Sequence, residues 1–241
     1  MLARRAGVSR AVAYFIESGQ PTSLAALIRV ANALGLRLDI ELSDPRRRLD
    51  ARPNLSGDPV HSAMGELEAR HLRGLRFPVG LDEPYQHYQF AGRADVVAWS
   101  ANRAALLHIE NRTRFPDFQE MAASYNAKRA YLAEAIGERV GITRWSSQTH
   151  VIAALWSAEV LHALRMRRES FRSLCPDPQD ALLSWWGGEP PPAGATSTLI
   201  VIDLLASGRQ RQFIGLDDAL TARPRHRGYA EAATALNANA A

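Results

Sequence analysis

The chain has 241 residues, of which 46% are hydrophobic and 22% are charged, with a formal net charge of +4 at pH 7. This composition predicts a globular protein with one large or two smaller cores. Because no apolar run approaches the roughly 20 residues of a membrane span, and the N-terminus lacks a signal-peptide core, we expect a cytoplasmic protein without a membrane partner. Cys175 is the only cysteine, which excludes an internal disulfide and a multi-cysteine zinc cluster.

Residues 1 to 42 predict three short helices joined by turns. The first helix ends at Gly7, and Ser9 is placed to cap the second. Ser23 caps a third helix, whose apolar residues recur at helical spacing until Gly35 ends it. The pattern favours a small all-α domain at this end of the chain.

The following residues predict an α/β domain after a linker. Residues 43 to 60 are rich in Pro, Asp and Arg and have no periodicity, as is typical of a linker. The elements expected next are a helix at 61–75, strands at 85–99 and 104–113, a helix at 117–139, a strand at 149–156, helices at 160–174 and 177–186, and a strand at 197–205. Residues 206 to 241 are expected to form a loose C-terminal tail.

Acidic and basic side chains gather on the second of these strands. Because side chains alternate along a strand, His108, Glu110 and Arg112 share one face. A hairpin through Ser100 would bring Asp95 of the preceding strand close to Glu110. Two carboxylates held in this way bind Mg²⁺, which can activate water and stabilise charge on a phosphodiester. The alternative is an ordinary solvated pair of acids.

A lysine two residues after the Glu would complete such a site, but this chain has Arg112 there. Arginine is larger, planar and effectively never deprotonated. Asn111 also places a polar side chain where an apolar one would normally pack into the core. Lys128, the only lysine, lies at the edge of the apolar stripe of the 117–139 helix. It can either reach the sheet and replace the missing lysine or snorkel over apolar surface to water.

The N-terminal residues carry the parts of a helix-turn-helix, whose second helix enters the major groove of DNA. The run LARRAGVSRAVAYFIESGQPTSLAALIRVANALGL resembles the Cro/C1-type (XRE) family, although that family's first helix is missing here. The resemblance implies a recognition helix in which Ser9, Arg10, Ala11 and Tyr14 face DNA. Val12 and Phe15 occupy positions that are usually polar in the family. The alternative is a small helical packing unit in which Arg10 is a solvated surface charge.

The central segments GRADVVAW and ALLHIENRT resemble the PD-(D/E)XK, restriction-endonuclease-like core. The closer resemblance is to a bacterial group that joins an XRE helix-turn-helix to such a domain. It implies a mixed sheet flanked by helices over residues 61 to 205. By the same resemblance Asp95 is the metal aspartate, Glu110 the second acid, Arg112 the residue at the lysine position, and Glu66 or Glu68 the auxiliary carboxylate for Mg²⁺.

These features together predict a DNA-binding protein, most simply a transcriptional regulator with a catalytically impaired nuclease-like domain and a possible homodimer. The alternative is a Mg²⁺-dependent DNA endonuclease that uses Asp95, Glu110 and either Arg112 or Lys128. A further alternative is an antitoxin-like module that binds another protein. The excess of arginine agrees with a nucleic-acid partner, although a GC-rich genome would produce the same excess.

Overall fold

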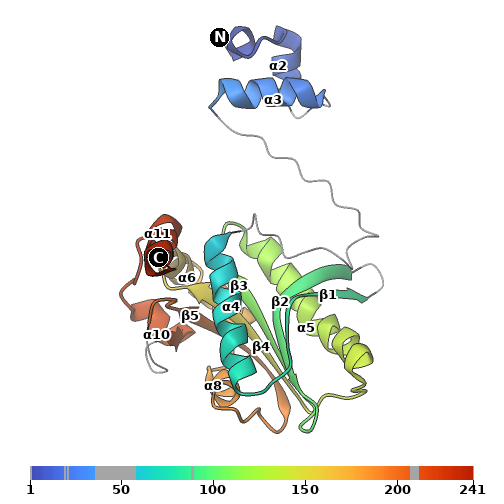
Figure 1. Ribbon diagram of the computed structural model, residues 1–241. Helices are drawn as coiled ribbons and strands as arrows, with labels where there is room; N and C mark the ends of the chain where they lie inside the picture. The colour runs from blue at the N-terminus through green and yellow to red at the C-terminus, as the bar shows by residue number, and fades with distance from the viewer. Residues whose placement is uncertain are drawn as a thin grey trace. The chain divides into compact units, whose positions relative to one another are not determined.

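The computed structural model describes residues 2–18, 20, 22–35, 58–87, 90–206 and 212–240, which belong to two compact units (Figure 1). The first unit spans Met1–Ala51 and the second Arg52–Ala241. The expected α/β class, with a helical segment at the N-terminus, is confirmed. The expected linker lies outside the described residues up to position 57, and its last residues begin a helix. None of the helices in the described part of the chain combines the length and apolar character needed to cross a membrane.

The N-terminal unit contains three short helices, as expected. They are α1 (Leu2–Ala6), α2 (Arg10–Glu17) and α3 (Leu24–Ala33). Ser9 caps α2 by accepting a hydrogen bond from the Val12 amide at 3.2 Å, and Ser23 caps α3 through the Ala26 amide at 3.3 Å. Gly7 turns the chain between α1 and α2 with a φ of 63°, which disfavours residues with a side chain.

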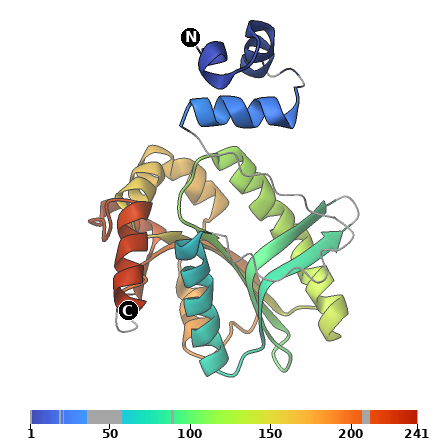
Figure 2. The ribbon, with the colours of Figure 1, turned by 45° about the horizontal axis from the view of Figure 1, so that its top comes forward.

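The second unit is built on a mixed sheet of six strands in the order β1 to β6 (Figures 1 and 2). The strands are β1 (Val79–His87), β2 (Phe90–Ser100), β3 (Ala105–Arg112), β4 (Ser147–Leu155), β5 (Gly194–Ile202) and β6 (Phe213–Gly215). Strands β1 to β3 are antiparallel, β3 to β5 are parallel, and β6 is antiparallel to β5. The mixed sheet expected from the resemblance is present.

The single strand expected at residues 85–99 is wrong, because this stretch belongs to a hairpin of β1 and β2. Tyr85 pairs with Gly92, and His87 pairs with Phe90. The sequence between the two strands contains no Gly, Pro or Asn that would indicate a turn.

Helices cover both faces of the sheet. They are α4 (Pro59–Gly74), α5 (Phe118–Val140), α6 (Ala158–Met166), α7 (Arg168–Leu174), α8 (Asp180–Trp186), α10 (Leu216–Thr221) and α11 (Tyr229–Ala240). On one face α4, α8 and α11 pack with Leu107 and Ile109 of β3 in one core cluster. On the other face α5 packs against Leu106, and α6, α7 and α10 complete the layer. Strand β3 is therefore buried on both sides, which makes its polar residues unusual.

The expected loose tail at residues 206–241 is also corrected. Its described residues form β6, α10 and α11, and Ala232 of α11 is buried in the core beside α4. The segment is rich in alanine, so its helical face has little hydrophobic contrast. Tyr229, Ala233 and Leu236 of α11 also pack against this core, a contact that depends on the folded chain.

The long helix α5 begins and ends as its sequence indicates. The Asp117 carboxylate accepts hydrogen bonds from the Gln119 and Glu120 amides, at 2.8 and 3.0 Å. After α5, the Ile142 amide donates to the carbonyl oxygen of Gly137 at 2.9 Å, so the chain folds back closely over this glycine. A Cβ at Gly137 would collide with the backbone carbonyl of Ile142, whereas a Cβ at Gly74 of α4 would meet open space.

We expect Gly137→Ala to lower the free energy of unfolding by about 1 to 3 kcal/mol, because backbone has to move to accommodate the methyl group. Gly74→Ala is the matched control and should leave stability unchanged or slightly higher. Urea unfolding followed by tryptophan fluorescence measures both, since all five tryptophans lie between residues 99 and 186 of the second unit. Equal stability of the two variants would contradict the close contact.

Candidate functional site

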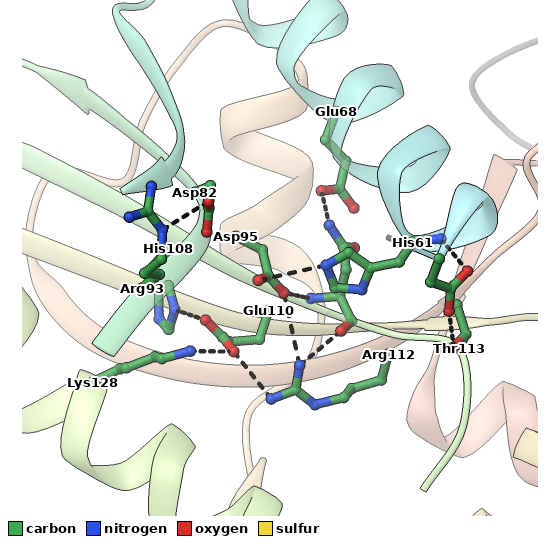
Figure 3. A network of polar contacts seen from close by, with 12 residues as sticks. His61, Glu68, Asp82, Arg93, Asp95, His108, Glu110, Arg112, Thr113 and Lys128 are labelled. Atoms are coloured by element: carbon green, nitrogen blue, oxygen red, sulfur yellow. Dashed lines mark hydrogen bonds and ion pairs between the residues drawn. The ribbon is translucent and has the colours of Figure 1, made fainter. Parts of the chain in front are cut away.

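The site is centred on Glu110, a carboxylate with 1% exposure in the middle of the sheet. Three donors from the α5 side of the sheet converge on it (Figure 3). His108 Nε2 lies 2.9 Å from one carboxylate oxygen, Oε1. Lys128 Nζ and Arg112 Nη2 donate to the other, Oε2, at 2.6 and 3.1 Å. Alternation along β3 places His108 and Arg112 on the same face as Glu110, and α5 supplies the lysine.

These contacts keep Glu110 ionised. Burial by itself would raise the pKa of the carboxyl, but the hydrogen bond from His108 and the charges of His108, Lys128 and Arg112 outweigh it. The pKa is held at about 2. Because an ionised carboxylate only accepts hydrogen bonds, the proton on His108 Nε2 points at Glu110.

Asp95 lies beside this group on β2. The antiparallel register Val96↔Ile109 brings Asp95, in the middle of β2, next to Glu110, and the Asn111 amide donates to Asp95 Oδ2 at 2.7 Å. Asp95 Oδ2 is 3.7 Å from Arg112 Nη1, and Asp95 Oδ1 is 3.6 Å from His61 Nε2 of α4. The hydrogen bond to Asp95 raises the pKa of His61. Asp95 and Glu110 therefore both lie against Arg112, as expected for a hairpin through Ser100.

Arg112 connects the two acids. Its Nη1 donates to the main-chain carbonyl of Asn111 at 2.8 Å and faces Asp95, while its Nη2 donates to Glu110 (Figure 3). The side chain is 24% exposed and lines a pocket of about 460 Å³. His61, Arg114 and Ser124 line the same pocket. Arg112 is therefore the cation on the solvent side of the site.

Lys128 is the cation on the inner side. Its side chain is 7% exposed and its ammonium is bonded to Glu110, so the alternative of a lysine snorkelling to water is wrong. Tyr125 and Leu132, about one turn before and after it on α5, are fully buried. Lys128 thus lies on the face of the helix that packs on the sheet, and burial is tolerated because the charge is paired.

The two glutamates considered as auxiliary acids have different positions. Glu66 is exposed on α4 and takes no part in the network described above. Glu68 is 1% exposed and accepts a hydrogen bond from Asn111 Nδ2 at 3.0 Å. Glu68 Oε1 and Asn111 Oδ1 are both buried without a partner. Burial raises the pKa of Glu68 to about 8, so this carboxyl is mostly protonated at neutral pH.

His150, which no sequence pattern indicated as a site residue, continues the network behind Glu110. Strands β3 and β4 are parallel and pair His108 with His150, whose Nδ1 atoms lie 3.2 Å apart. Burial holds the pKa of His150 well below its usual range, which makes it a neutral partner for His108. No spacing along the sequence predicted this contact, because it depends on the register between two strands separated by α5.

The residues expected to face DNA lie on the surface of the first unit. Ser9, Arg10, Ala11 and Tyr14 are all exposed, and Tyr14 is 66% exposed. Ala13 points inward and is buried, whereas Val12 is half-buried and Phe15 is exposed. Phe15 and Glu17 of α2 are exposed as well, so the residues that the resemblance selected are accessible on a helix that is mostly exposed.

No family model, curated protein or solved structure matches the chain. Within the described residues, no group of three or more His, Cys, Asp or Glu side chains is arranged to hold a metal ion. The oxygens of Asp95 and Glu110 are of the type that Mg²⁺ prefers, but both acids face the Arg112 guanidinium. With Arg112 in place, the site does not fit a divalent cation.

We expect Glu68→Gln to stabilise the second unit at neutral and alkaline pH. A carboxyl whose pKa rises from 4.5 to about 8 on folding contributes stability below pH 4.5, and this contribution is lost as the pH rises through 8. Glutamine keeps the shape and does not ionise. The stability difference between variant and unmodified protein should therefore grow over this interval, by at most about 1.4 kcal/mol per pH unit.

Urea unfolding at a series of pH values measures this difference. Glu66→Gln, two residues away on the exposed side of α4, is the matched control and should retain the pH dependence of the unmodified protein. If Glu68→Gln also retained it, the raised pKa of Glu68 would be wrong.

Proposed function

We propose that the chain is a DNA-binding regulatory protein in which an XRE-type helix-turn-helix is joined to a PD-(D/E)XK-type unit with an impaired cutting site. The exposed face of α2 supports the first part. The second part is supported by the hairpin that joins Asp95 and Glu110, with α4 before it and α5 and β4 after it. A cytoplasmic location and a homodimer on DNA belong to the same proposal.

The observation that carries the impaired site is the position of Arg112 between the two acids. A metal-dependent nuclease needs carboxylate oxygens that are free to bind the ion. Here Glu110 is bonded to three side chains, and the guanidinium is too basic to release a proton and serve as a general base. In the resting site the basic side chains neutralise the acids and leave no free base or metal ligand on Glu110. This arrangement favours a structural or regulatory role.

DNA recognition is assigned to the N-terminal face of α2. Ser9 fixes the start of the helix, and Arg10 and Tyr14 are one turn apart on its exposed side. An arginine in this position reads guanine through two hydrogen bonds or contacts a phosphate. Both contacts need an exposed guanidinium at the beginning of the helix, and Arg10 provides one.

We expect Arg10→Ala to weaken specific DNA binding by about 1 to 3 kcal/mol if Arg10 reads a base. Fluorescence anisotropy with duplexes selected from a random-sequence pool measures the affinity, and the affinity of the unmodified protein should fall as salt is raised. Arg29→Ala, an exposed arginine on α3, is the control and should have a smaller effect. Unchanged binding in Arg10→Ala would remove α2 from the interface.

A second candidate function, a metal-dependent DNA endonuclease, is favoured by the 2.6 Å contact between Lys128 and Glu110. The chemistry depends on where the ammonium lies and not on its place in the sequence. Lys128 therefore supplies from α5 the positive charge that the family places on the strand. Under this candidate, Arg112 would have to leave the acids before cutting.

We expect no nicking of supercoiled plasmid by the unmodified protein in Mg²⁺ or Mn²⁺. Arg112→Lys, which replaces the guanidinium by a compact ammonium, should create metal-dependent nicking, and Asp95→Ala in that background should abolish it. The endonuclease candidate makes the opposite prediction. It requires robust nicking by the unmodified protein that is lost in both Glu110→Gln and Lys128→Met.

A further inference from the structure

Three oxygen atoms converge on the guanidinium of Arg112. They are Glu110 Oε2 at 3.1 Å, the main-chain carbonyl oxygen of Asn111 at 2.8 Å and Asp95 Oδ2 at 3.7 Å. They come from two neighbouring strands, so the backbone of the hairpin fixes their relative positions. Two carboxylates and one carbonyl form a set of hard oxygen donors suited to a small divalent cation. In this chain the cation that they surround is a side chain.

Arg112 supplies one of the positive charges that compensate the two acids. Asp95 and Glu110 carry two negative charges, and the Arg112 guanidinium and the Lys128 ammonium oppose them, together with the His108 and His61 rings. Replacing Arg112 by a neutral side chain would remove one of these two positive charges and leave the acids with Lys128, the His108 and His61 rings and the Asn111 carbonyl. An uncompensated carboxylate in a buried place is costly, so such a site would attract a cation from solution.

The two cations differ in how easily they can be replaced. Lys128 is enclosed between α5 and the sheet, whereas Arg112 borders the pocket of about 460 Å³. An ion from solvent would approach through this pocket and meet Arg112 first. Arg112 is therefore the group that decides whether the oxygens are open to an ion.

We infer that Arg112 is a built-in cation, which occupies the position where Asp95, Glu110 and the Asn111 carbonyl would hold a divalent metal ion and so excludes the ion. This inference deepens the proposed function, since it gives a physical reason for the impaired cutting site. Removal of the Arg112 side chain should therefore open these oxygens to the ion.

The test measures the binding of Mn²⁺ and Mg²⁺ alone to the full chain by isothermal titration calorimetry, without DNA. We expect Arg112→Met to bind Mn²⁺ at least about ten-fold more tightly than the unmodified protein, because the guanidinium no longer competes. Adding Glu110→Gln to Arg112→Met should abolish the gain. Mn²⁺ should also raise the melting temperature of Arg112→Met and leave that of the unmodified protein unchanged.

Arg114→Met is the matched control. Arg114 lines the same pocket, but its guanidinium lies over the ring of Tyr229 at 4.8 Å, so this variant should bind Mn²⁺ no better than the unmodified protein. Circular dichroism and tryptophan fluorescence establish that each variant is folded, and Arg112→Gln replaces Arg112→Met if the latter is not.

Two results would overturn the inference. One is equal Mn²⁺ affinity in the unmodified protein and the folded Arg112 variant. The other is no binding by a folded Arg112 variant. The failure of DNA binding would bear on the proposed function alone, because no DNA is present in this test.

Discussion

The second unit depends on the compensation of one buried charge, the carboxylate of Glu110. A carboxylate on a strand covered by helices on both faces is stable only if donors replace the water that it loses. His108, Lys128 and Arg112 supply these donors from β3 and α5. The ion pair with Lys128 therefore joins the long helix to the sheet, in addition to the apolar contacts around Tyr125 and Leu132.

A second buried carboxyl, that of Glu68 on α4, lies on the opposite face of β3 and has a different protonation state. In the described part of the chain Glu68 has one hydrogen-bond donor, Asn111, and no cation is among the causes that shift its pKa. Its pKa is therefore raised to about 8, whereas that of Glu110 is lowered to about 2. Glu68 and Glu110 are equally buried, each with 1% exposure. Glu68 is neutral and Glu110 is charged because their neighbouring groups differ. Asn111 connects Glu68 to the acids on the other face of β3. Its main-chain amide donates to Asp95, and its side-chain amide donates to Glu68.

The same compensation bears on function. An acid pair that is neutralised by basic side chains is stable without a metal ion. A protein with such a site can therefore keep its fold without metal-dependent catalysis. The arginine at position 112 and the lysine at position 128 together satisfy the acids within the fold. Arg112 is the one of these two cations that borders the pocket.

The sequence by itself determined the local elements and much of the central group. Caps at Ser9, Ser23 and Asp117 set helix starts, and the alternation in β3 placed Glu110 and Arg112 on one face, because both depend on neighbouring residues only. The tertiary structure decided what depends on distant segments. The β3–β4 register set His150 against His108, the docking of α5 turned Lys128 inward, and packing of α11 on the core buried Ala232. Local periodicity carries no information about these contacts, since each is set by how separate elements pack together.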